Sequence, residues 1–448
     1  MPTERASRVT STQTVSSNSV RNDSSREALN TRGAIHPRPE GLGFLASKDK
    51  RKRMIMNMKK DEKAVFLPAK LESSYRPRII SLFAGCGGMD AGFHLEGYET
   101  VWANEFNQWA ANSYETNFKG VQVDRRSILD IDPKKEKGIP EADLVIGGFP
   151  CQDFSMTWKR PGLNGARGGL YKEYLKFIDA KKPKAFIAEN VKGIISANQG
   201  EAIRQIVRDF ASIEPGYTLS IKLYNFADYG VPQFRERILI VGIRNDTGFD
   251  FQHPMPTHGP KAGKAYFTAG MALEGAEHVA DNNEHMKIMP RTKEILRKIP
   301  EGGNFTSIPQ DDPHYVKGMI SHVYRRVNRN EPSKTLIASG GGGTWGYHYE
   351  EARALTNRER ARLQSFRDDF KFVGSFGEIR RQIGNAVPPD GIRLLARNLK
   401  QLFIGGYKAV DLYEKSKILN ALPMKKRILT DYYETTFNKK KTSSTQTR

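Results

Sequence analysis

The stretch RPRIISLFAGCGGMDAGF, residues 76–93, decides the fold. RPRIISLF is typical of a buried β-strand, and DAGFHLEGY, which begins at Asp90, has the spacing of an amphipathic helix. The glycines at 85, 87 and 88 let the backbone approach a ligand closely at the start of that helix. A glycine-rich loop can also simply turn the chain, so its surroundings have to decide between the two.

Strands and helices continue to alternate up to about residue 245. The runs TVWANE, ADLVIGGF, KAFIAEN and RILIVGIR predict strands, and EAIRQIVRDFASI predicts one of the helices between them. This alternation predicts a mostly parallel sheet in an α/β, Rossmann-like domain. Further along the chain, LTNRERARLQSF and GIRLLARNLKQLF predict two more helices.

Changes in composition divide the chain into five predicted segments. The first is Ser/Thr/Asn-rich and should be disordered. Its basic cluster KDKRKRMIMNMKK fits either contact with phosphates or a solvated tether. The third is rich in Gly, Pro and His with little periodicity, as in an inserted second domain. We predict a basic arm (1–75), the α/β domain (76–245), the insert (246–330), a return segment that completes the α/β domain (331–413) and a loose basic tail (414–448).

The chain is strongly basic, with 71 Lys and Arg against 50 Asp and Glu and a net charge of +21. A positive field attracts polyanions such as nucleic acid, although general solubility is an alternative explanation. Two cysteines cannot form a disulfide framework, and without CxxC or His-rich clusters we expect no metal. With neither an apolar run long enough to span a membrane nor a secretory signal, we expect a cytoplasmic protein with no membrane association.

Two acidic residues suggest what the glycine loop binds. Glu105 ends the next predicted strand, about 20 residues on, where a carboxylate can accept two ribose hydroxyls. Asp130, in RRSILDID, suits the amine of an adenine. The loop is not GxGxxG, and GxxxxGK[ST] is absent, so we predict a nucleoside ligand without a pyrophosphate. Each residue alone fits an ordinary turn or a surface acid, but together they favour a cofactor site.

A second set of residues is predicted at the same sheet edge. Cys151, in GGFPCQDFS, follows one strand, and Glu189 ends the next. Gln233, Arg235 and Arg237 alternate with strand period, so they should share one face. A thiol, a carboxyl group and guanidinium groups would supply a nucleophile, a proton donor and electrostatic support. A core cysteine and surface ion pairs are the alternatives for each residue alone.

In this order, the motifs resemble those of DNA (cytosine-5)-methyltransferases of the bacterial restriction–modification type. The resemblance covers roughly residues 78–402. FAGCGG resembles the first motif, NEF the second, GFPCQDFS the catalytic one, ENV the sixth and QFRER the eighth. NRNEPSKTLIASGGGG and IGNAVPP resemble the ninth and tenth, and RGGLY holds a leucine that contacts the cofactor in the family.

The resemblance implies a class I S-adenosylmethionine-dependent methyltransferase sheet (76–245) with a smaller target-recognition domain (246–330). It implies that Cys151 attacks C6 of a flipped-out cytosine in double-stranded DNA and that Glu189 protonates N3. Arg235 would support O2, and Arg237 would help to hold the site. We expect a monomer paired functionally with a restriction endonuclease. The resemblance places S-adenosylmethionine among Phe83, Ala84, Gly85, Gly87, Gly88, Glu105, Phe106, Asp130, Ile131, Pro150, Leu170, Asn385 and Val387.

Two rival interpretations fit the residues less well. RNA enzymes of the other cytosine-5 class use two nearby cysteines, but here Cys86 lies in the glycine loop. The tRNA enzyme on the DNA-enzyme fold has Pro-Pro-Cys-Gln, usually followed by Phe-Thr-Arg, where this chain has Phe-Pro-Cys-Gln and Asp-Phe-Ser. A non-enzymatic DNA-binding relative would be expected to lack Cys151, Glu189 or Arg235. Phe106 stands where the family often has Trp, and it keeps a ring that can stack on adenine.

Overall fold

The computed structural model describes residues 75–150, 170–260, 262–315, 323–338, 343–344 and 346–429. All of them belong to one compact unit. The predicted basic arm lies outside the described residues except for Tyr75, and so does the predicted nucleophile Cys151.

Eight strands form the central sheet. They are β1 (Arg78–Leu82), β2 (Glu99–Asn104), β3 (Gln122–Asp124), β4 (Leu144–Gly147), β5 (Ala185–Val191), β6 (Tyr217–Asn225), β8 (Glu236–Arg244) and β10 (Ile428–Leu429). Their order is β10-β6-β8-β5-β4-β1-β2-β3. All neighbours are parallel except that β8 is antiparallel to β5 and β6, which confirms the predicted mostly parallel α/β sheet.

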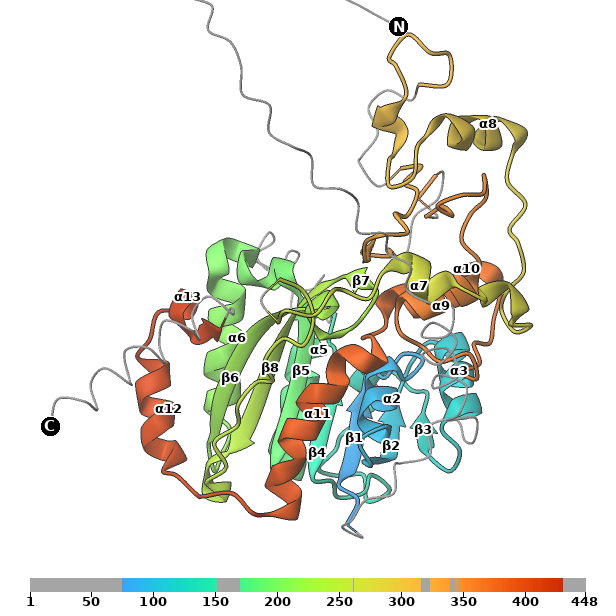
Figure 1. The fold of residues 1–448 in the computed structure, drawn as a ribbon. Coiled ribbons are helices and arrows are strands. Elements are labelled where there is room, and N and C mark those ends of the chain that lie inside the picture. The colour runs from blue at the N-terminus through green and yellow to red at the C-terminus, as the bar shows by residue number, and fades with distance from the viewer. Residues whose placement is uncertain are drawn as a thin grey trace, which may run out of the picture. The chain divides into compact units, whose positions relative to one another are not determined.

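Helices connect and cover these strands (Figure 1). The helices are α2 (Gly88–His94), α3 (Gln108–Asn117), α5 (Leu170–Lys181), α6 (Glu201–Ala211), α7 (Ala269–Leu273), α8 (Pro290–Lys298), α9 (Asn357–Leu363), α10 (Phe376–Asn385), α11 (Pro389–Ile404), α12 (Leu412–Asn420) and α13 (Met424–Arg427). The helices predicted from periodicity are confirmed as α2, α6, α9 and α11.

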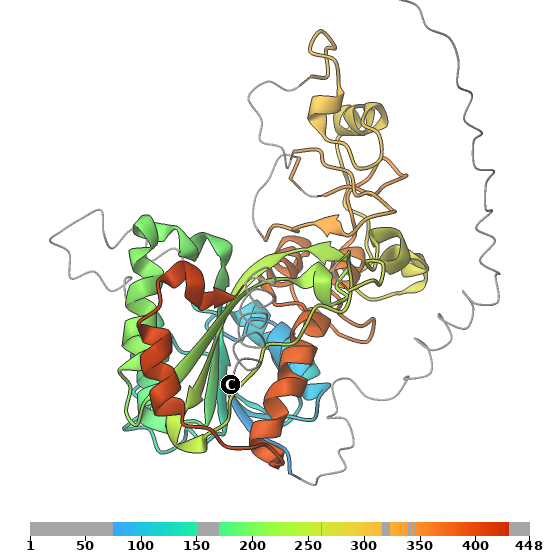
Figure 2. The ribbon, with the colours of Figure 1, turned by 60° about the vertical axis from the view of Figure 1, so that its left-hand side comes forward.

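Both faces of the sheet are buried, which explains the apolar runs LVIG in β4 and ILIV in β8. On one face, Ile80 and Val145 pack with α5 and α6 in one core cluster. On the other, Ile79 and Ile146 pack with α2 and α11 in a second cluster. Figure 2 shows α6 (green) and α11 (orange-red) on opposite sides of the sheet.

The strand order reverses its direction at one point along the sheet. β1 lies between β2 and β4, so the chain proceeds outward in one direction through β2 and β3 and in the other through β4 and β5. The loops that follow β1 and β4 therefore diverge, and ligands of open α/β sheets bind at such a point. The glycine loop follows β1 there, and the GGFP segment follows β4.

Helix α11 and the residues just before it pack so closely against α2 that backbone atoms of the two segments approach each other. A Cβ added at Gly92 of α2 would lie 2.2 Å from Cγ2 of Ile392 and 2.5 Å from the carbonyl oxygen of Pro389 in α11. One at Gly88 would lie 2.4 Å from the carbonyl oxygen of Val387. Glycines in α2 thus allow a segment some 300 residues further along the chain to reach the loop after β1.

The predicted loose tail is wrong for the residues up to Leu429. Residues 412–429 form α12, α13 and β10, and β10 pairs with β6 at the edge of the sheet. Leu412 and Ile428 are buried in the core clusters, and the Asp411 side chain accepts from the amide of Glu414 at the start of α12. Other apolar residues here, such as Tyr413 and Ile418, are exposed, so no clear apolar face reveals these elements in the sequence.

The predicted insert has little regular structure. Its first residues still belong to the α/β unit, because Phe249 and Phe251 pack in the same cluster as the sheet. Further on, α7 shares a small core with Leu336 and Leu363 of the return segment. The strands β7 (Gln233–Phe234) and β9 (Ser333–Lys334) form a separate parallel pair.

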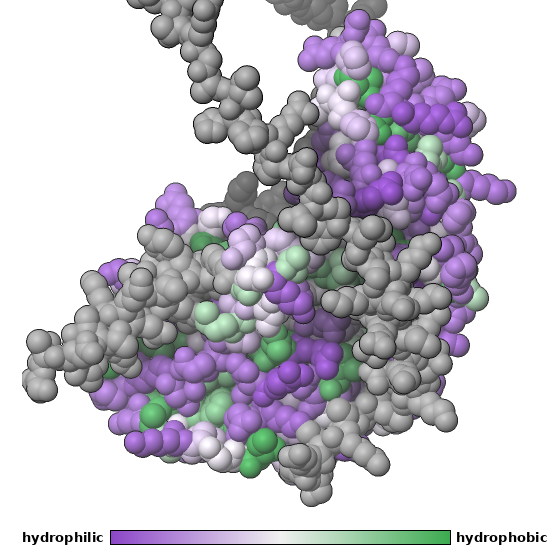
Figure 3. All heavy atoms as spheres, in the orientation of Figure 1, coloured by the Kyte–Doolittle hydropathy of each residue, from purple (hydrophilic) through white to green (hydrophobic). Residues whose placement is uncertain are grey.

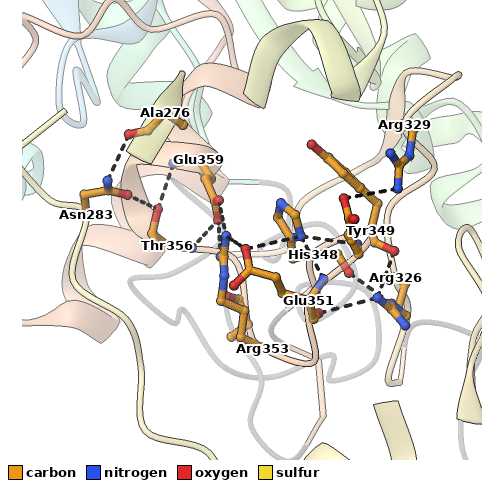
Figure 4. A network of polar contacts seen from close by, with 12 residues as sticks. Ala276, Asn283, Arg326, Arg329, His348, Tyr349, Glu351, Arg353, Thr356 and Glu359 are labelled. Atoms are coloured by element: carbon orange, nitrogen blue, oxygen red, sulfur yellow. Dashed lines mark hydrogen bonds and ion pairs between the residues drawn. The ribbon is translucent and has the colours of Figure 1, made fainter. Parts of the chain in front are cut away.

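Polar contacts hold the insert to the return segment (Figure 4). Arg326 donates to the carbonyl oxygens of His348 and Tyr349. At the start of α9, Thr356 and Glu359 form a capping box, and Glu359 also pairs with Arg353 at 2.8 Å. These contacts fix the backbone where regular secondary structure is sparse.

The described surface is mostly polar. On the face shown in Figure 3, hydrophilic residues cover much of the described surface and hydrophobic ones are scattered. Within the described ranges, every helix is too short or too polar to cross a bilayer.

The contact between α2 and α11 gives a first prediction. Gly92→Ala should lower the free energy of unfolding by about 1–3 kcal/mol, because the new methyl group overlaps a backbone carbonyl that cannot easily move. Gly138→Ala is the matched control, since no atom lies within 4 Å of its added Cβ. Urea denaturation measures both variants, and equal stabilities would contradict the packing described here.

Candidate active site

The glycine loop and Glu105 form the first half of the site. The amide of Gly85 donates to Oε2 of Glu105 at 2.8 Å, and the amide of Asn107 donates to Oε1 at 2.7 Å. Burial raises the pKa of this carboxyl group, while the two amides oppose that shift. Each carboxylate oxygen accepts one backbone amide and keeps a further lone pair with which it can bind a hydroxyl group.

The loop has an unusual backbone. Phe83 has φ of 53°, and Gly87 has φ of 91°. An added Cβ at Gly87 would lie 2.2 Å from the ring of Phe118, so only glycine fits there. The amide of Ala84 donates to the carbonyl oxygen of Asn104 at 3.1 Å, which ties the loop to the end of β2. A strained backbone held on several sides is typical of ligand-binding sites.

The predicted tenth motif lies against this loop. The carbonyl oxygen of Val387 lies where a side chain on Gly88 would be, and the thiol of Cys86 is 3.9 Å from the carbonyl oxygen of Gln382. Asn385, at the end of α10, is exposed. The glycine loop near the start of the α/β domain and the tenth motif near its end are therefore brought together.

The other predicted cofactor residues occupy different environments. The ring of Phe106 is 73% exposed, which leaves it free to stack on a ligand. Asp130 is exposed at the end of a 3-10 turn, Ile128–Asp130, and Ile131 is buried. Pro150 is exposed, and Leu170 is half-buried at the start of α5. Of these five residues, Ile131 and Leu170 belong to or pack against the same core cluster as Phe83 of the glycine loop.

The second half of the site is centred on Glu189 in β5. Nε of Arg237 lies 2.9 Å from its Oε1, and both side chains are largely buried. An added Cβ at Gly148, just after β4, would lie 2.6 Å from Oε2. Asn190 donates to the carbonyl oxygen of Phe149 at 2.9 Å. The chain segment that leads to Cys151 is thus fixed beside this carboxyl group.

The protonation of Glu189 depends on opposing effects. Burial raises its pKa, while the charges of Arg237 and Arg235 lower it less strongly. Arg235 is 1% exposed, and burial together with the charge of Arg237 lowers its pKa to about 9. A carboxyl group whose pKa is raised keeps its proton to higher pH than an exposed one, which favours general acid catalysis.

The three alternating residues do not all lie at this carboxyl group. Arg235 and Arg237 act on Glu189 electrostatically, and Nη2 of Arg235 also donates to the carbonyl oxygen of Gly384 at 2.8 Å. Gln233 instead binds the return segment: it donates to the carbonyl oxygen of Leu363 and accepts from the amide of Leu336. The period of two could not distinguish these neighbours, because it says nothing about the return segment.

An open cavity of about 440 Å³ lies beside Arg237. Asn225, Phe234 and Thr335 are among the residues that line it. The sequence did not predict a role for these residues, nor for Gly148 and Asn190. Close backbone packing, hydrogen bonds to the backbone and the lining of a cavity leave no periodic pattern in a sequence. An aromatic ring, an amide and a guanidinium group around such a space suit a planar polar ligand.

Known proteins are similar to this chain in sequence, and a solved structure is similar to it in fold. The family model of C-5 cytosine-specific DNA methylases matches residues 77–401. The type II methyltransferase M.NgoFVII of Neisseria gonorrhoeae is 60% identical over 346 residues, which cover 77% of this chain and 91% of that protein. M.BbvI of Brevibacillus brevis is 43% identical over 343 residues, which cover 72% and 90%.

Among solved structures, a prophage-encoded E. coli protein described as a DNA modification methyltransferase has a TM-score of 0.59. The two sequences are 21% identical, and the match covers 73% of this chain and all of that one. At this identity the likeness supports a shared fold alone.

The ion pair at Glu189 gives a second prediction. Arg237→Met should raise the pKa of Glu189, because it removes the nearest opposing charge and leaves burial in place. Lys192→Met is the control, since Lys192 pairs with the exposed Glu236 at 2.9 Å. Titration of 13C-labelled glutamates by NMR, with Glu189→Gln to assign the signal, measures both. An unchanged or lower pKa in the Arg237 variant would contradict this account.

Proposed function

The chain belongs to the C-5 cytosine-specific DNA methylase family, and on that basis we propose that Cys151, Glu189, Arg235 and Arg237 act together on a flipped-out cytosine. The enzyme is a DNA (cytosine-5)-methyltransferase with the α/β fold of class I methyltransferases. One observation carries the finer proposal. The buried carboxyl group of Glu189, paired with Arg237 at 2.9 Å, lies beside the segment that leads to Cys151.

The residues of the first half of the site fit S-adenosylmethionine. Glu105 has lone pairs for ribose hydroxyls, Gly85 and Gly87 let the backbone approach, and Phe106 offers an exposed ring to the adenine. We place Asp130, Ile131, Pro150, Leu170, Asn385 and Val387 around the same ligand. When bound, this cofactor supplies an electrophilic methyl group to C5 of the cytosine.

The proposed steps at the cytosine use the second half of the site. The thiolate of Cys151 forms a bond to C6, and Glu189 in its acid form donates a proton to N3, so C5 gains the electron pair of an enamine. Arg235 supports O2, and Arg237 holds the carboxyl group of Glu189 in place. After C5 has gained the methyl group, solvent water takes the proton of C5, the bond between sulfur and C6 breaks to regenerate the thiolate, and N3 returns its proton to the carboxylate of Glu189, which restores the ring.

The substrate requires the base to leave the helix. C6 of a stacked cytosine cannot be reached inside a duplex. We therefore propose that the target nucleotide is flipped out of the helix, which is how DNA methyltransferases generally reach their target base. The 440 Å³ cavity beside Arg237 offers space for it. Residues 246–330 are proposed to read the sequence, and the net charge of +21 favours the DNA backbone.

The biological setting is proposed from the relatives. M.NgoFVII and M.BbvI are named type II methyltransferases, which supports pairing with a restriction endonuclease. We propose that the protein works as a monomer on DNA in the bacterial cytoplasm.

Bisulfite sequencing of DNA from an expressing host will identify the modified sequence, and a restriction endonuclease that cuts there should then fail to cut that DNA. Full cleavage would argue against a protective role.

The covalent route gives a third prediction. Cys151→Ala should abolish methyl transfer but retain DNA binding, because the nucleophile is lost while the basic surface remains. Bisulfite sequencing measures the transfer, and a duplex that contains 5-fluorocytosine at the identified site should trap the wild-type enzyme as a stable adduct. Measurable turnover by the alanine variant would reject the covalent route.

The cofactor pocket gives a fourth prediction. Phe106→Ala should weaken binding of S-adenosylmethionine by about 1–3 kcal/mol, the usual contribution of an aromatic side chain stacked on a base. Met289→Ala is the control, because Met289 is 72% exposed but lies in the predicted insert. Isothermal titration calorimetry measures both affinities. Equal losses in the two variants, or none in either, would remove Phe106 from the pocket.

A further inference from the structure

A second cavity, of about 80 Å³, lies where β9 meets α9. We call it the Arg360 pocket. Its exposed rim includes Glu331 and Lys334, and its buried lining includes Ser333 and Arg360. Thr335 lines both this pocket and the cavity beside Arg237, so the two are neighbours. A volume of about 10–15 Å³ on this measure holds one water molecule, so the pocket has room for a larger polar group.

Three donors in this pocket have no acceptor among the described residues. Ser333 and Arg360 are each 2% exposed, and no described residue accepts from Oγ of Ser333 or from Nε and Nη2 of Arg360. Burial, together with the charge of Arg380, lowers the pKa of Arg360 to about 9, so the guanidinium group is still charged at neutral pH. Burying a charged group without a partner is costly, and proteins retain such groups where a ligand supplies the partner.

Folding accounts for the neighbouring arginines but not for Arg360. Arg358, two residues earlier in α9, donates to the carbonyl oxygens of Asp281, Arg367 and Phe370, each at 3.0 Å. Arg326, which also lines the pocket, donates to backbone carbonyl oxygens, two of which are shown in Figure 4. These two side chains join segments of backbone, whereas two of the nitrogens of Arg360 have no hydrogen-bond partner in the described part of the chain.

The charges around the pocket select an anion. Arg325, Arg326, Lys334 and Arg360 line it, and Glu331 is the one carboxylate among its described lining residues. A guanidinium group with two free donors binds the oxygens of a phosphate in a forked geometry, and a hydroxyl group can add a third hydrogen bond.

We propose that the Arg360 pocket binds a phosphate of the DNA backbone close to the flipped nucleotide. The proposal rests on the proposed function, because it takes DNA as the ligand. Thr335 lines both the Arg360 pocket and the cavity proposed for the base. A phosphate bound in the pocket would therefore hold the DNA strand next to the nucleotide that is flipped out. Free inorganic phosphate has the same chemistry, and the experiment separates the two sources.

The test is the salt dependence of binding to a duplex of mixed sequence. Phosphate contacts do not depend on sequence, and each adds close to one unit to the slope of log K against log salt. Arg360→Met should reduce that slope by about 1 and weaken binding several-fold at low salt. Ser333→Ala should weaken binding with a smaller change of slope, because it removes a hydrogen bond and no charge.

Two control variants separate this effect from charge and from stability. Arg397→Met removes a positive charge that is 57% exposed and paired with Glu96 at 2.9 Å, and it should leave the slope unchanged. Arg358→Met should lower the melting temperature, because three carbonyl oxygens lose their donor. Arg360→Met should melt at or above the wild-type temperature when no ligand is present, because no described contact is lost.

Each outcome decides the proposal. If the slope is unchanged in Arg360→Met and the wild-type enzyme methylates DNA, the proposal that the Arg360 pocket binds a DNA phosphate is rejected, while the proposed function stands. If that slope is unchanged but inorganic phosphate stabilises the wild type and not the variant, relative to chloride at equal ionic strength, then the pocket binds free anions instead. A wild type that neither binds nor methylates DNA overturns both proposals. Should Arg360→Met fail to fold, unaltered DNA binding by Ser333→Ala overturns the pocket.

Discussion

The close approach of β4 to its neighbours is the constraint on which the site depends. A Cβ added at Gly147 would lie 2.4 Å from the carbonyl oxygen of Leu82 in β1, and one added at Gly148 would lie 2.6 Å from the carboxylate of Glu189. The parallel register pairs Gly147 with Leu82 on one side and with Ala188 on the other, so β1 and β4 end level with each other while β5 continues to Val191. Only a pair of glycines lets β4 end between them. The cofactor half and the catalytic half of the site are therefore neighbours because two side chains are missing.

The C-terminal end of α10 connects those two halves. The carbonyl oxygen of Gln382 contacts the thiol of Cys86 in the glycine loop, and that of Gly384, two residues later, accepts from the buried Arg235. Arg235 in turn helps to hold the pKa of Glu189 below the value that burial alone would give. A displacement of α10 would thus alter both the shape of the cofactor loop and the proton affinity of the acid. The return segment is part of the site, and it reaches the glycine loop through the side chains of Phe366 and Ile383 as well as through backbone carbonyl oxygens.

The sequence predicts what depends on periodicity and misses what depends on distant contacts. Apolar runs predict the strands, and the rule that ligands bind where strand order reverses predicts that Glu105 and Glu189 lie at one edge. The helix α12 and the strand β10 are missed because apolar residues such as Tyr413 and Ile418 are exposed, so the apolar residues of this stretch do not mark one buried face. The different surroundings of Gln233 and Arg237 are missed for a related reason. Alternation along a strand gives the face of a residue but not the segment that later packs against it.

The excess of basic residues has more than one cause, and the hydrogen bonds separate them. At the level of composition, a charge of +21 fits either a solvated surface or a partner that is a polyanion. Arg358 and Arg326 are explained by the carbonyl oxygens that they bind, and Arg397 by its pair with Glu96. Arg360 is buried as well, and two of its nitrogens have no acceptor within the described ranges. Solubility cannot explain a buried charge, and folding cannot explain donors that bind nothing, so what remains is a ligand that brings the acceptors with it.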